Sequence, residues 1–207
     1  FGALLGAFAA ARAVGRFRLV GFSDTGDMLR NLCGATLMGI GGVLALGRVH
    51  FEMYEQLCLV TGTSRPLQNA VEWGCGGGAN AVHFIGEVRS FCGIEIARPS
   101  LDECGRVLAA VGFTGFQPVL VSAETPEQAL EAAPGPFDLF LSTYVYELLP
   151  GRGYAERITQ IAWQLLRPGG LALIQTRYDD GSPRSSQKNA DYFRHSTRFT
   201  SFRVEEF

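Results

Sequence analysis

A glycine-rich stretch from Val71 to Asn80, VEWGCGGGAN, is the part of the chain where residue types and spacing indicate chemistry. It places a carboxylate, Glu72, two residues before the first of four glycines. Glycine has no Cβ and adopts positive φ readily, so such a run lets the main chain approach a ligand closely. The stretch predicts either a ligand-binding turn or a tight bend, and the surrounding elements must decide between the two.

Those elements begin at Gln68, where short apolar runs start to alternate with helical segments. This alternation predicts βαβ units and an α/β fold, namely a Rossmann-like, doubly wound and mainly parallel sheet. Ligands of such sheets bind beyond the carboxyl ends of the strands, which is where the glycine-rich stretch lies. Strands are expected over residues 69–73, 91–96, 117–122, 137–142 and 171–176, and helices around residues 79–88, 99–111, 125–132 and 152–166.

Residues 1–65 differ in charge from the rest of the chain. They carry six arginines and four acidic residues, against 12 basic and 16 acidic residues in 66–207. We therefore expect a helical N-terminal cap over residues 1–65 and the Rossmann-like domain over residues 66–207. The run Asn31–Gly47 has no charge over 17 residues, but glycines interrupt it, which favours a buried cap helix over a membrane span.

An amphipathic helix is predicted at the end of this cap, in GRVHFEMYEQLCLVTG. Its apolar residues recur at helical spacing, and the glycine at position 62 is a suitable helix stop. The apolar residues that define the predicted stripe are Val49, Met53, Leu57 and Val60.

Composition excludes several classes of function. A net charge of −2, from 18 basic and 20 acidic residues, does not suit a protein that neutralises a nucleic-acid backbone. The adjacent acids Asp179 and Asp180 are the pattern of a solvated turn, so we expect no metal. An odd number of cysteines without a CxxC pair indicates reduced thiols in a cytoplasm and no zinc; these are Cys33, Cys58, Cys75, Cys92 and Cys104.

Two families of ligand fit the glycine pattern. Gly74, Gly76 and Ala79 satisfy the dinucleotide fingerprint G-x-G-x-x-A, and Glu95 follows Gly74 by 21 residues, where a ribose-binding acid belongs. An NAD(P)-dependent oxidoreductase is therefore one alternative. Against it, the residues before the first glycine of a dinucleotide turn are normally apolar, whereas this chain has Glu72 there.

Several motifs together resemble the class I S-adenosylmethionine-dependent methyltransferase family. The run from Glu72 to Gly78 is similar to that family's first motif, E/D-x-G-x-G-x-G. GIEIARPSLDEC resembles the family's second strand, with Glu95 as its terminal acid. PFDLFLSTYVYELLPG and LLRPGGLALIQT resemble the fourth strand and the turn before the fifth. The matches follow the family's order across residues 68–176.

The resemblance implies S-adenosyl-L-methionine as cofactor and assigns roles to individual residues. Glu95 would accept hydrogen bonds from both ribose hydroxyls, while Glu72 and the backbone near Ser142 would suit the ammonium of the methionine end. Ser122 replaces the family's usual acid near the adenine, so the Ala123 amide is the expected substitute. The implied cofactor-binding residues are Glu72, Gly74, Cys75, Gly76, Gly78, Glu95, Ile96, Ser122, Ala123, Glu124 and Ser142.

Methyl transfer to a hydroxyl needs an aligned acceptor and a proton acceptor. The candidate catalytic residues are His195, Tyr144 and His50. STYVYELL follows the fourth strand and lacks the Asn/Asp-Pro-Pro-aromatic motif of methyltransferases that act on DNA or glutamine. We therefore expect a cytoplasmic enzyme that methylates a small molecule at oxygen, with no nucleic-acid partner and no membrane. A module that binds the cofactor or a partner without catalysis is the other alternative.

Overall fold

The computed structural model describes residues 45–63, 67–182 and 200–203. The chain divides into two compact units, Phe1–Leu46 and Gly47–Phe207, and the second contains nearly all of the described residues. Most of the expected cap over residues 1–65 lies outside the described residues and stays a prediction. The same holds for His195.

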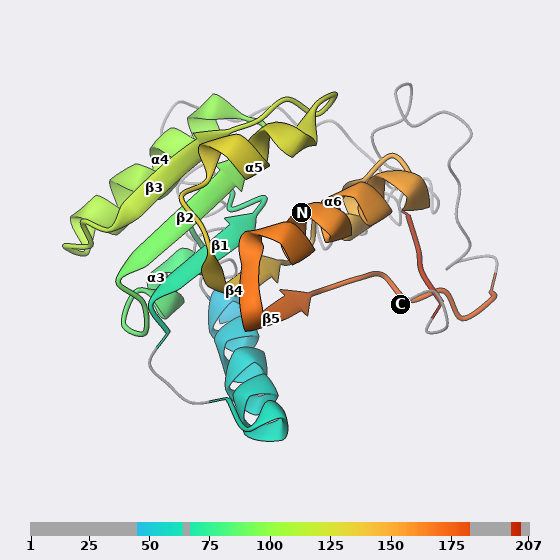
Figure 1. The fold of residues 1–207 in the computed structure, drawn as a ribbon, viewed down its shortest axis with the longest axis horizontal. Helices are drawn as coiled ribbons and strands as arrows, with labels where there is room; N and C mark the ends of the chain where they lie inside the picture. Colours follow the sequence, from blue (N-terminus) through green and yellow to red (C-terminus); the bar gives the residue numbers. More distant parts are fainter. Residues whose placement is uncertain (1–44, 64–66, 183–199, 204–207) are drawn as a thin grey trace, which may run out of the picture. The chain divides into compact units, whose positions relative to one another are not determined.

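A five-stranded sheet of parallel strands, ordered β3-β2-β1-β4-β5, forms the centre of the larger unit (Figure 1). Because β1 lies between β2 and β4, the chain reverses its direction of progress across the sheet there, and crossover loops on either side of β1 leave space for a ligand. This confirms the predicted Rossmann-like, doubly wound sheet. The strands are β1 Asn69–Trp73, β2 Ser90–Glu95, β3 Phe116–Leu120, β4 Phe137–Ser142 and β5 Leu166–Ile174.

Both faces of the sheet are covered, as the buried strands require. Val71 and Trp73 point to a core shared with one pair of helices, whereas Ala70 points to a core shared with the other helices. The first face packs against α5 Ala129–Ala132 and α6 Arg152–Leu165, and the second against α3 Ala81–Phe84, α4 Arg98–Ala110 and the helix over residues 45–61. Two short 3₁₀ turns, η1 Pro126–Gln128 and η2 Tyr146–Leu148, complete the connections.

The helix over residues 45–61 packs by a different face from the predicted stripe. Its buried residues are Gly47, His50, Tyr54 and Cys58, whereas Val49, Met53 and Val60 of the predicted stripe are exposed. Gly47 explains the choice of face, because a Cβ there would lie 2.1 Å from the Ala79 carbonyl oxygen. The helix ends at Gly62, which has a φ of +65°, as predicted. Among the described residues no helix is both long and apolar enough to cross a membrane.

Several predicted boundaries are wrong by a few residues. β2 ends at Glu95 and β3 at Leu120, so Ile96 and Ser122 lie in loops and not in strands. α3 has only four residues instead of the predicted span 79–88. The segment LRPGG, expected as a turn, belongs to β5, where a bulge between Phe137 and Leu139 of β4 absorbs its extra residues.

The segment 200–203 is fixed beside the end of β5 and supports η2. The Thr200 hydroxyl donates to the Leu149 carbonyl at 2.7 Å, and the Thr200 N–H donates to the Glu147 carbonyl at 2.8 Å. Phe202 is buried, with its ring centroid 6.3 Å from that of Tyr146. The segment 200–203 therefore helps to fix the residues of η2, which follow β4.

Candidate active site

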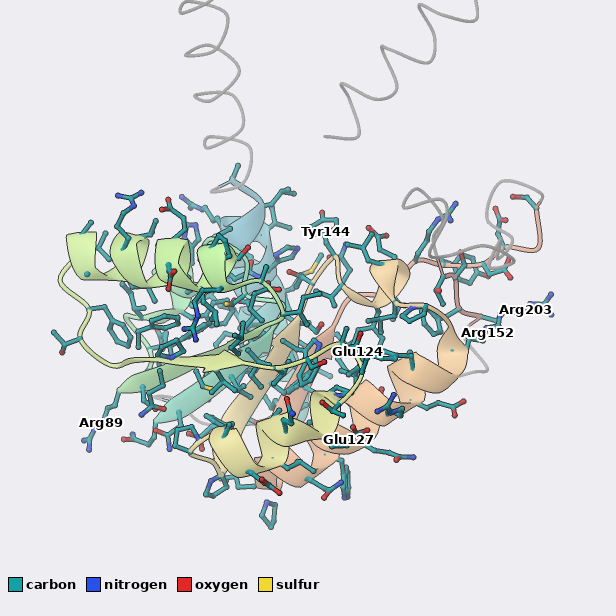
Figure 2. The ribbon with its side chains drawn as sticks, turned by 90° about the horizontal axis from the view of Figure 1, so that it is seen from above. Arg89, Glu124, Glu127, Tyr144, Arg152 and Arg203 are labelled. Atoms are coloured by element: carbon teal, nitrogen blue, oxygen red, sulfur yellow. The ribbon has the colours of Figure 1, made fainter. Side chains whose placement is uncertain are left out.

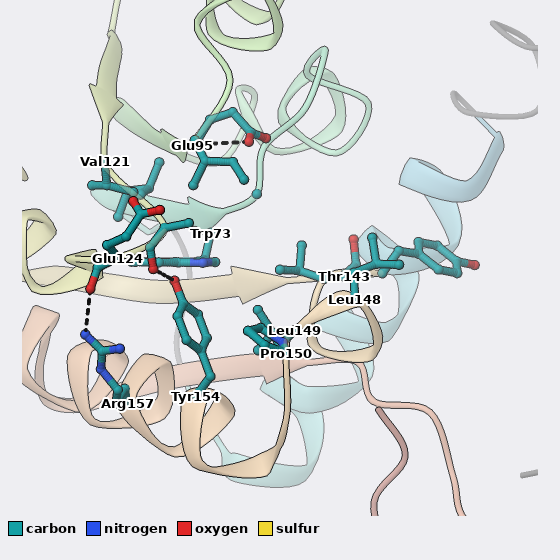
Figure 3. A pocket seen from close by; sticks show the side chains of 16 residues that line it. Trp73, Glu95, Val121, Glu124, Thr143, Leu148, Leu149, Pro150, Tyr154 and Arg157 are labelled. Carbon is teal, nitrogen blue, oxygen red and sulfur yellow. Dashed lines mark hydrogen bonds between the residues drawn. The ribbon is translucent and has the colours of Figure 1, made fainter. Parts of the chain in front are cut away.

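A cavity of about 680 Å³ opens at the carboxyl ends of the strands (Figure 3). The last residues of β1 and β2 line it, together with the loops after β3 and β4 and the first turns of α6. Its lining is mostly apolar, with a few carboxyl, hydroxyl and guanidinium groups. The lining residues are Trp73, Gly74, Ile94, Glu95, Ile96, Val121, Ala123, Glu124, Thr143, Tyr144, Val145, Leu148, Leu149, Pro150, Tyr154 and Arg157.

The glycines after β1 differ in what surrounds the position that a Cβ would occupy. A Cβ at Gly74 would lie 2.3 Å from the Val145 side chain, and a Cβ at Gly78 would lie 3.0 Å from the Cys104 sulfur. These two positions therefore let the turn pack against its protein neighbours. Gly76 has a φ of +49° and nothing within 4 Å of the position its Cβ would occupy. Gly76 does not line the cavity, but the open space around it leaves its main chain accessible to a ligand.

Cys75 lies in the middle of this turn, but its side chain faces the core. The residue is buried, and its thiol interacts with that of Cys104. The Cys104 contact and burial together raise the pKa of the Cys75 thiol well above its usual range. Only the main chain of Cys75 is suited to contact a ligand.

Glu95, at the end of β2, holds the glycine turn and the next turn together. Its Oε2 accepts the Gly76 N–H at 3.2 Å, and its Oε1 accepts the N–H groups of Ile96 at 2.8 Å and Ala97 at 3.3 Å. A carboxylate has about four acceptor positions, so this one retains acceptor capacity on the cavity side. The main chain fixes its orientation before any ligand arrives.

Glu72, on the neighbouring strand, is in the opposite situation. It is 2% exposed; the Asn80 side-chain amide donates to its Oε1, and its Oε2 has no partner within the described part of the chain. Burial raises the pKa of Glu72 to about 8, and the nearby Glu95 charge adds to this, although the Asn80 hydrogen bond opposes it. Glu72 contacts α3 through the side chain of its N-cap residue, Asn80. A buried carboxyl with one unpaired oxygen suits a cationic group.

Asn80 links Glu72 to the far side of the cavity. No role was predicted for this residue from the sequence. Its amide also donates to the Thr143 hydroxyl at 2.8 Å, and its carbonyl oxygen lies 2.7 Å from His50 Nδ1. The His50 ring lies 5.5 Å, between centroids, from the Tyr144 ring. Figure 2 shows Tyr144 on the side of the sheet that α4 covers, away from Glu127. A buried chain of hydrogen bonds therefore runs from the end of β1 to Thr143 in the cavity wall, and its His50 branch contacts the ring of Tyr144.

The first turns of α6 hold the loop after β3 (Figure 3). The Tyr154 hydroxyl donates to the Ala123 carbonyl at 2.7 Å, and the Arg157 guanidinium donates to the Glu124 carbonyl at 3.3 Å. Arg157 also forms an ion pair with Glu127, with an Nε–Oε1 distance of 2.8 Å. Ala123 and Glu124 of this loop line the cavity, and α6 binds the main-chain carbonyls of both residues.

Six of the predicted site residues line the cavity, whereas Cys75, Gly76, Gly78, Ser122 and Ser142 do not. Ser142 is fully buried, and its hydroxyl and carbonyl bond to Trp73 and Gln175 at 3.3 and 2.8 Å, so its neighbour Thr143 forms the wall instead. Ser122 lies outside the cavity wall, where its hydroxyl donates to the Glu124 carboxylate. The predicted residues in the wall are Gly74, Glu95, Ile96, Ala123, Glu124 and Tyr144; Glu72 and His50 stand directly behind it.

The acids after β5 form local turns. Asp179 accepts the Gly181 N–H at 3.0 Å, and Asp180 accepts the Ser182 N–H at 2.9 Å. Within residues 45–63, 67–182 and 200–203, no three acidic, histidine or cysteine side chains are grouped as metal ligands.

Solved structures with similar folds were found, whereas no curated protein matches the sequence. Coclaurine N-methyltransferase bound to N-methylheliamine and SAH is 14% identical over 59% of this chain and 34% of its own, with a TM-score of 0.46. The CcbJ methyltransferase from Streptomyces caelestis is 22% identical over 57% and 46%, with a TM-score of 0.48. An S-adenosylmethionine-dependent methyltransferase from Clostridium acetobutylicum is 14% identical over 61% and 50%, with a TM-score of 0.49. This chain thus spans at most about half of each.

Two family models match the chain. One, described as "Sulphur transport", matches residues 1–48, of which the structure describes residues 45–48. The other, described as "Methyltransferase domain", matches residues 71–174, from β1 to the end of β5. It confirms the predicted S-adenosyl-L-methionine cofactor, and the open Gly76, the fixed Glu95 carboxylate and the unpaired Glu72 oxygen fit that cofactor. Because the match covers half of the chain, this protein belongs to the S-adenosylmethionine-dependent methyltransferase family.

Proposed function

We propose that this protein transfers the methyl group of S-adenosyl-L-methionine to an oxygen atom of a small molecule. The observation that carries the proposal is a pair of carboxyl groups on adjacent strands, on either side of a bare glycine turn. Glu95 is fixed by main-chain N–H groups and faces the cavity. Glu72 is buried with one unpaired oxygen. The two environments suit the two polar ends of one cofactor.

Each part of the cofactor has a matching group in the cavity wall or directly behind it. One ribose hydroxyl can donate to the acceptor position that Glu95 keeps free, and the second can take the place of its longest main-chain bond, from Ala97 at 3.3 Å. The ammonium can donate to Glu72 Oε2, which would relieve the cost of burying this carboxylate. The main chain at Gly76 allows the close approach between these two ends. For the adenine, the wall offers the Ala123 amide and the Glu124 side chain, in the loop that α6 holds.

The bound cofactor supplies a methyl group on a sulfonium, which is a good leaving group. The protein has to align the acceptor, exclude water and remove a proton from a hydroxyl. Leu148, Leu149 and Pro150 give the cavity a largely apolar wall on the side of η2. Tyr144 and His50 lie at the far end of the network that begins at Glu72, and we assign the acceptor side to them.

The proposal includes a small-molecule partner, no nucleic-acid partner and a cytoplasmic location. The net charge of −2 supports the first two, because a nucleic-acid surface requires a basic patch. The four cysteines of the described residues, Cys58, Cys75, Cys92 and Cys104, are buried free thiols, which suits a reducing compartment.

Calorimetric titration with S-adenosylhomocysteine and, separately, with NAD tests the proposal. We expect saturable binding of S-adenosylhomocysteine and none of NAD, since Glu72 and Glu95 beside the glycine turn offer a pyrophosphate no positive charge. Binding of NAD alone would favour the oxidoreductase. Methyl release from labelled S-adenosylmethionine, measured against a panel of phenols, alcohols and amines, then separates an oxygen-directed enzyme from an amine-directed one and from a module that binds without catalysis.

A further inference from the structure

The hydrogen bonds of Asn80 determine which nitrogen of His50 carries a proton. Both hydrogens of the Asn80 amide are used, one by Glu72 and one by Thr143. The Asn80 oxygen therefore faces His50 Nδ1 at 2.7 Å, and only a protonated Nδ1 can donate to it. In a neutral imidazole the lone pair is then on Nε2.

The packing of the helix over residues 45–61 fixes His50 in this place. Gly47 lets the helix approach the Ala79 carbonyl, and His50 lies one turn further along the same buried face. His50 is 4% exposed, and among the described residues its Nε2 has no hydrogen-bond partner. Nε2 itself is not fully buried, so it can accept a hydrogen bond from a ligand.

The ring of Tyr144 packs beside His50 and reaches the cavity. Tyr144 has a φ of +59°, a left-handed conformation that non-glycine residues rarely adopt. Such backbone strain is found mainly at functional sites, where the surrounding structure maintains it. Here the ring contact with His50 and the neighbouring Thr143–Asn80 hydrogen bond hold the residue on both sides.

We propose that His50 Nε2 is the proton acceptor for methylation of a hydroxyl and that Asn80 is the positioning residue that keeps the lone pair on that nitrogen. The inference rests on the proposed function. As the acceptor oxygen gains the methyl group, its proton passes to Nε2 and gives an imidazolium with both nitrogens protonated. That proton then leaves to water, which restores the neutral ring with Nδ1–H bonded to Asn80.

Nuclear magnetic resonance of protein labelled with ¹⁵N-histidine tests the tautomer without any cofactor. We expect His50, identified by the loss of its signals in His50→Gln, to show a protonated Nδ1 and an unprotonated Nε2. Asn80→Ala should move the proton towards Nε2, while His83→Gln, on the nearby α3, should leave the His50 signals unchanged. A wild-type His50 with its proton on Nε2 would overturn the proposal, whether or not Asn80→Ala folds.

Addition of phenol, the simplest aromatic hydroxyl, tests the role of Nε2 in protein saturated with S-adenosylhomocysteine. A hydrogen bond from the phenol should shift the His50 Nε2 resonance and leave that of His83 in place. No shift at the highest soluble phenol concentration, or equal shifts at both histidines, would contradict the assignment. If S-adenosylhomocysteine itself does not bind, the proposed function fails. The tautomer of His50 is measured without cofactor, so that result tests the role of Asn80 independently.

Discussion

A glutamate lies near the end of β1 and another at the end of β2, but the two differ in burial and in hydrogen-bond partners. Glu95 faces the cavity and accepts three main-chain N–H groups. Glu72, one strand away, is buried, receives one side-chain hydrogen bond and keeps one oxygen unpaired. The pKa of Glu72 is raised by desolvation, so the group is ready to ionise when a cation arrives.

We propose that these neighbouring strands hold separate parts of one ligand. A carboxylate fixed by backbone donors is suited to neutral hydroxyls, because its charge is already stabilised. A buried carboxyl without a counter-charge is suited to an ammonium, because the ligand then supplies the positive charge that the protein lacks there. The geometry of the parallel sheet places the two groups at one edge, and their environments decide their roles.

The largest expected effect is at the ribose. Glu95→Ala should weaken S-adenosylhomocysteine binding roughly a thousandfold, because two charge-assisted hydrogen bonds of about 2 kcal/mol each are lost. Glu95→Gln, which keeps the acceptor oxygen, should lose less. Calorimetry measures both, with Glu156→Ala, an exposed acid on α6, as the matched control. Unchanged affinity in Glu95→Ala would exclude Glu95 from the ribose site.

The next effect is a pH dependence set by Glu72. Its pKa of about 8 in the free protein should fall when the ammonium binds, so binding releases a proton below that pH. Affinity for S-adenosylhomocysteine should therefore rise with pH, by up to about tenfold per unit, and level off above pH 8. Calorimetry in buffers of different ionisation enthalpy counts the proton. In Glu72→Gln the release should vanish; its persistence there would point to another group.

The same pKa predicts the pH dependence of folding without ligand. Because Glu72 holds its proton more tightly when folded than when unfolded, this group makes the folded state less stable as pH rises from 4.5 to about 8. Urea unfolding should show Glu72→Gln gaining stability over the wild type across that window and gaining nothing further above it. A constant difference at all pH values would contradict the assigned pKa.

A smaller effect is expected where α6 holds the loop after β3. Tyr154→Phe removes the hydrogen bond to the Ala123 carbonyl and should weaken S-adenosylhomocysteine binding roughly fivefold, the equivalent of about 1 kcal/mol. Tyr178→Phe, at an exposed position outside the cavity wall, is the control. Equal affinities of the two variants would show that the loop keeps its conformation without the hydrogen bond from Tyr154.

The smallest effect is expected at the ion pair on the outer side of that loop. Glu127→Gln breaks the pair with Arg157, but both side chains are close to half exposed, so solvent screens the interaction. Denaturant unfolding should show a loss below about 1 kcal/mol, and cofactor affinity should change less than twofold. A loss as large as that of Tyr154→Phe would mean that the pair, and not the tyrosine, holds the loop.

The sheet and the cofactor side of the site could be predicted from sequence because their signals are local. Strand–helix alternation, the glycines after β1 and the acid at the end of β2 all lie within short stretches, and parallel pairing brings strand ends to one edge. The boundaries of α3 and β5 could not be predicted in the same way. They depend on a bulge and on packing between residues far apart in the sequence.

The contacts around His50 and Tyr144, the side that we assign to the acceptor, were predicted less completely because they are not local. The prediction named His50 and Tyr144 but not Asn80, which joins them to Glu72, because nothing in the sequence reports a hydrogen bond across 30 residues. The stripe of Val49 and Met53 was wrong because periodicity does not say which of two apolar faces is buried, and Gly47 decided it here. Tyr154 and Arg157 were missed because α6 meets the loop after β3 only in the folded chain.

A crystal structure of the protein with S-adenosylhomocysteine tests the central claim most directly. We predict that the ribose hydroxyls will donate to Glu95 and that the ammonium will contact Glu72 Oε2, with the main chain of Gly76 between them. An empty cavity in crystals soaked to saturation, or a ligand whose ammonium lies away from Glu72, would contradict the account.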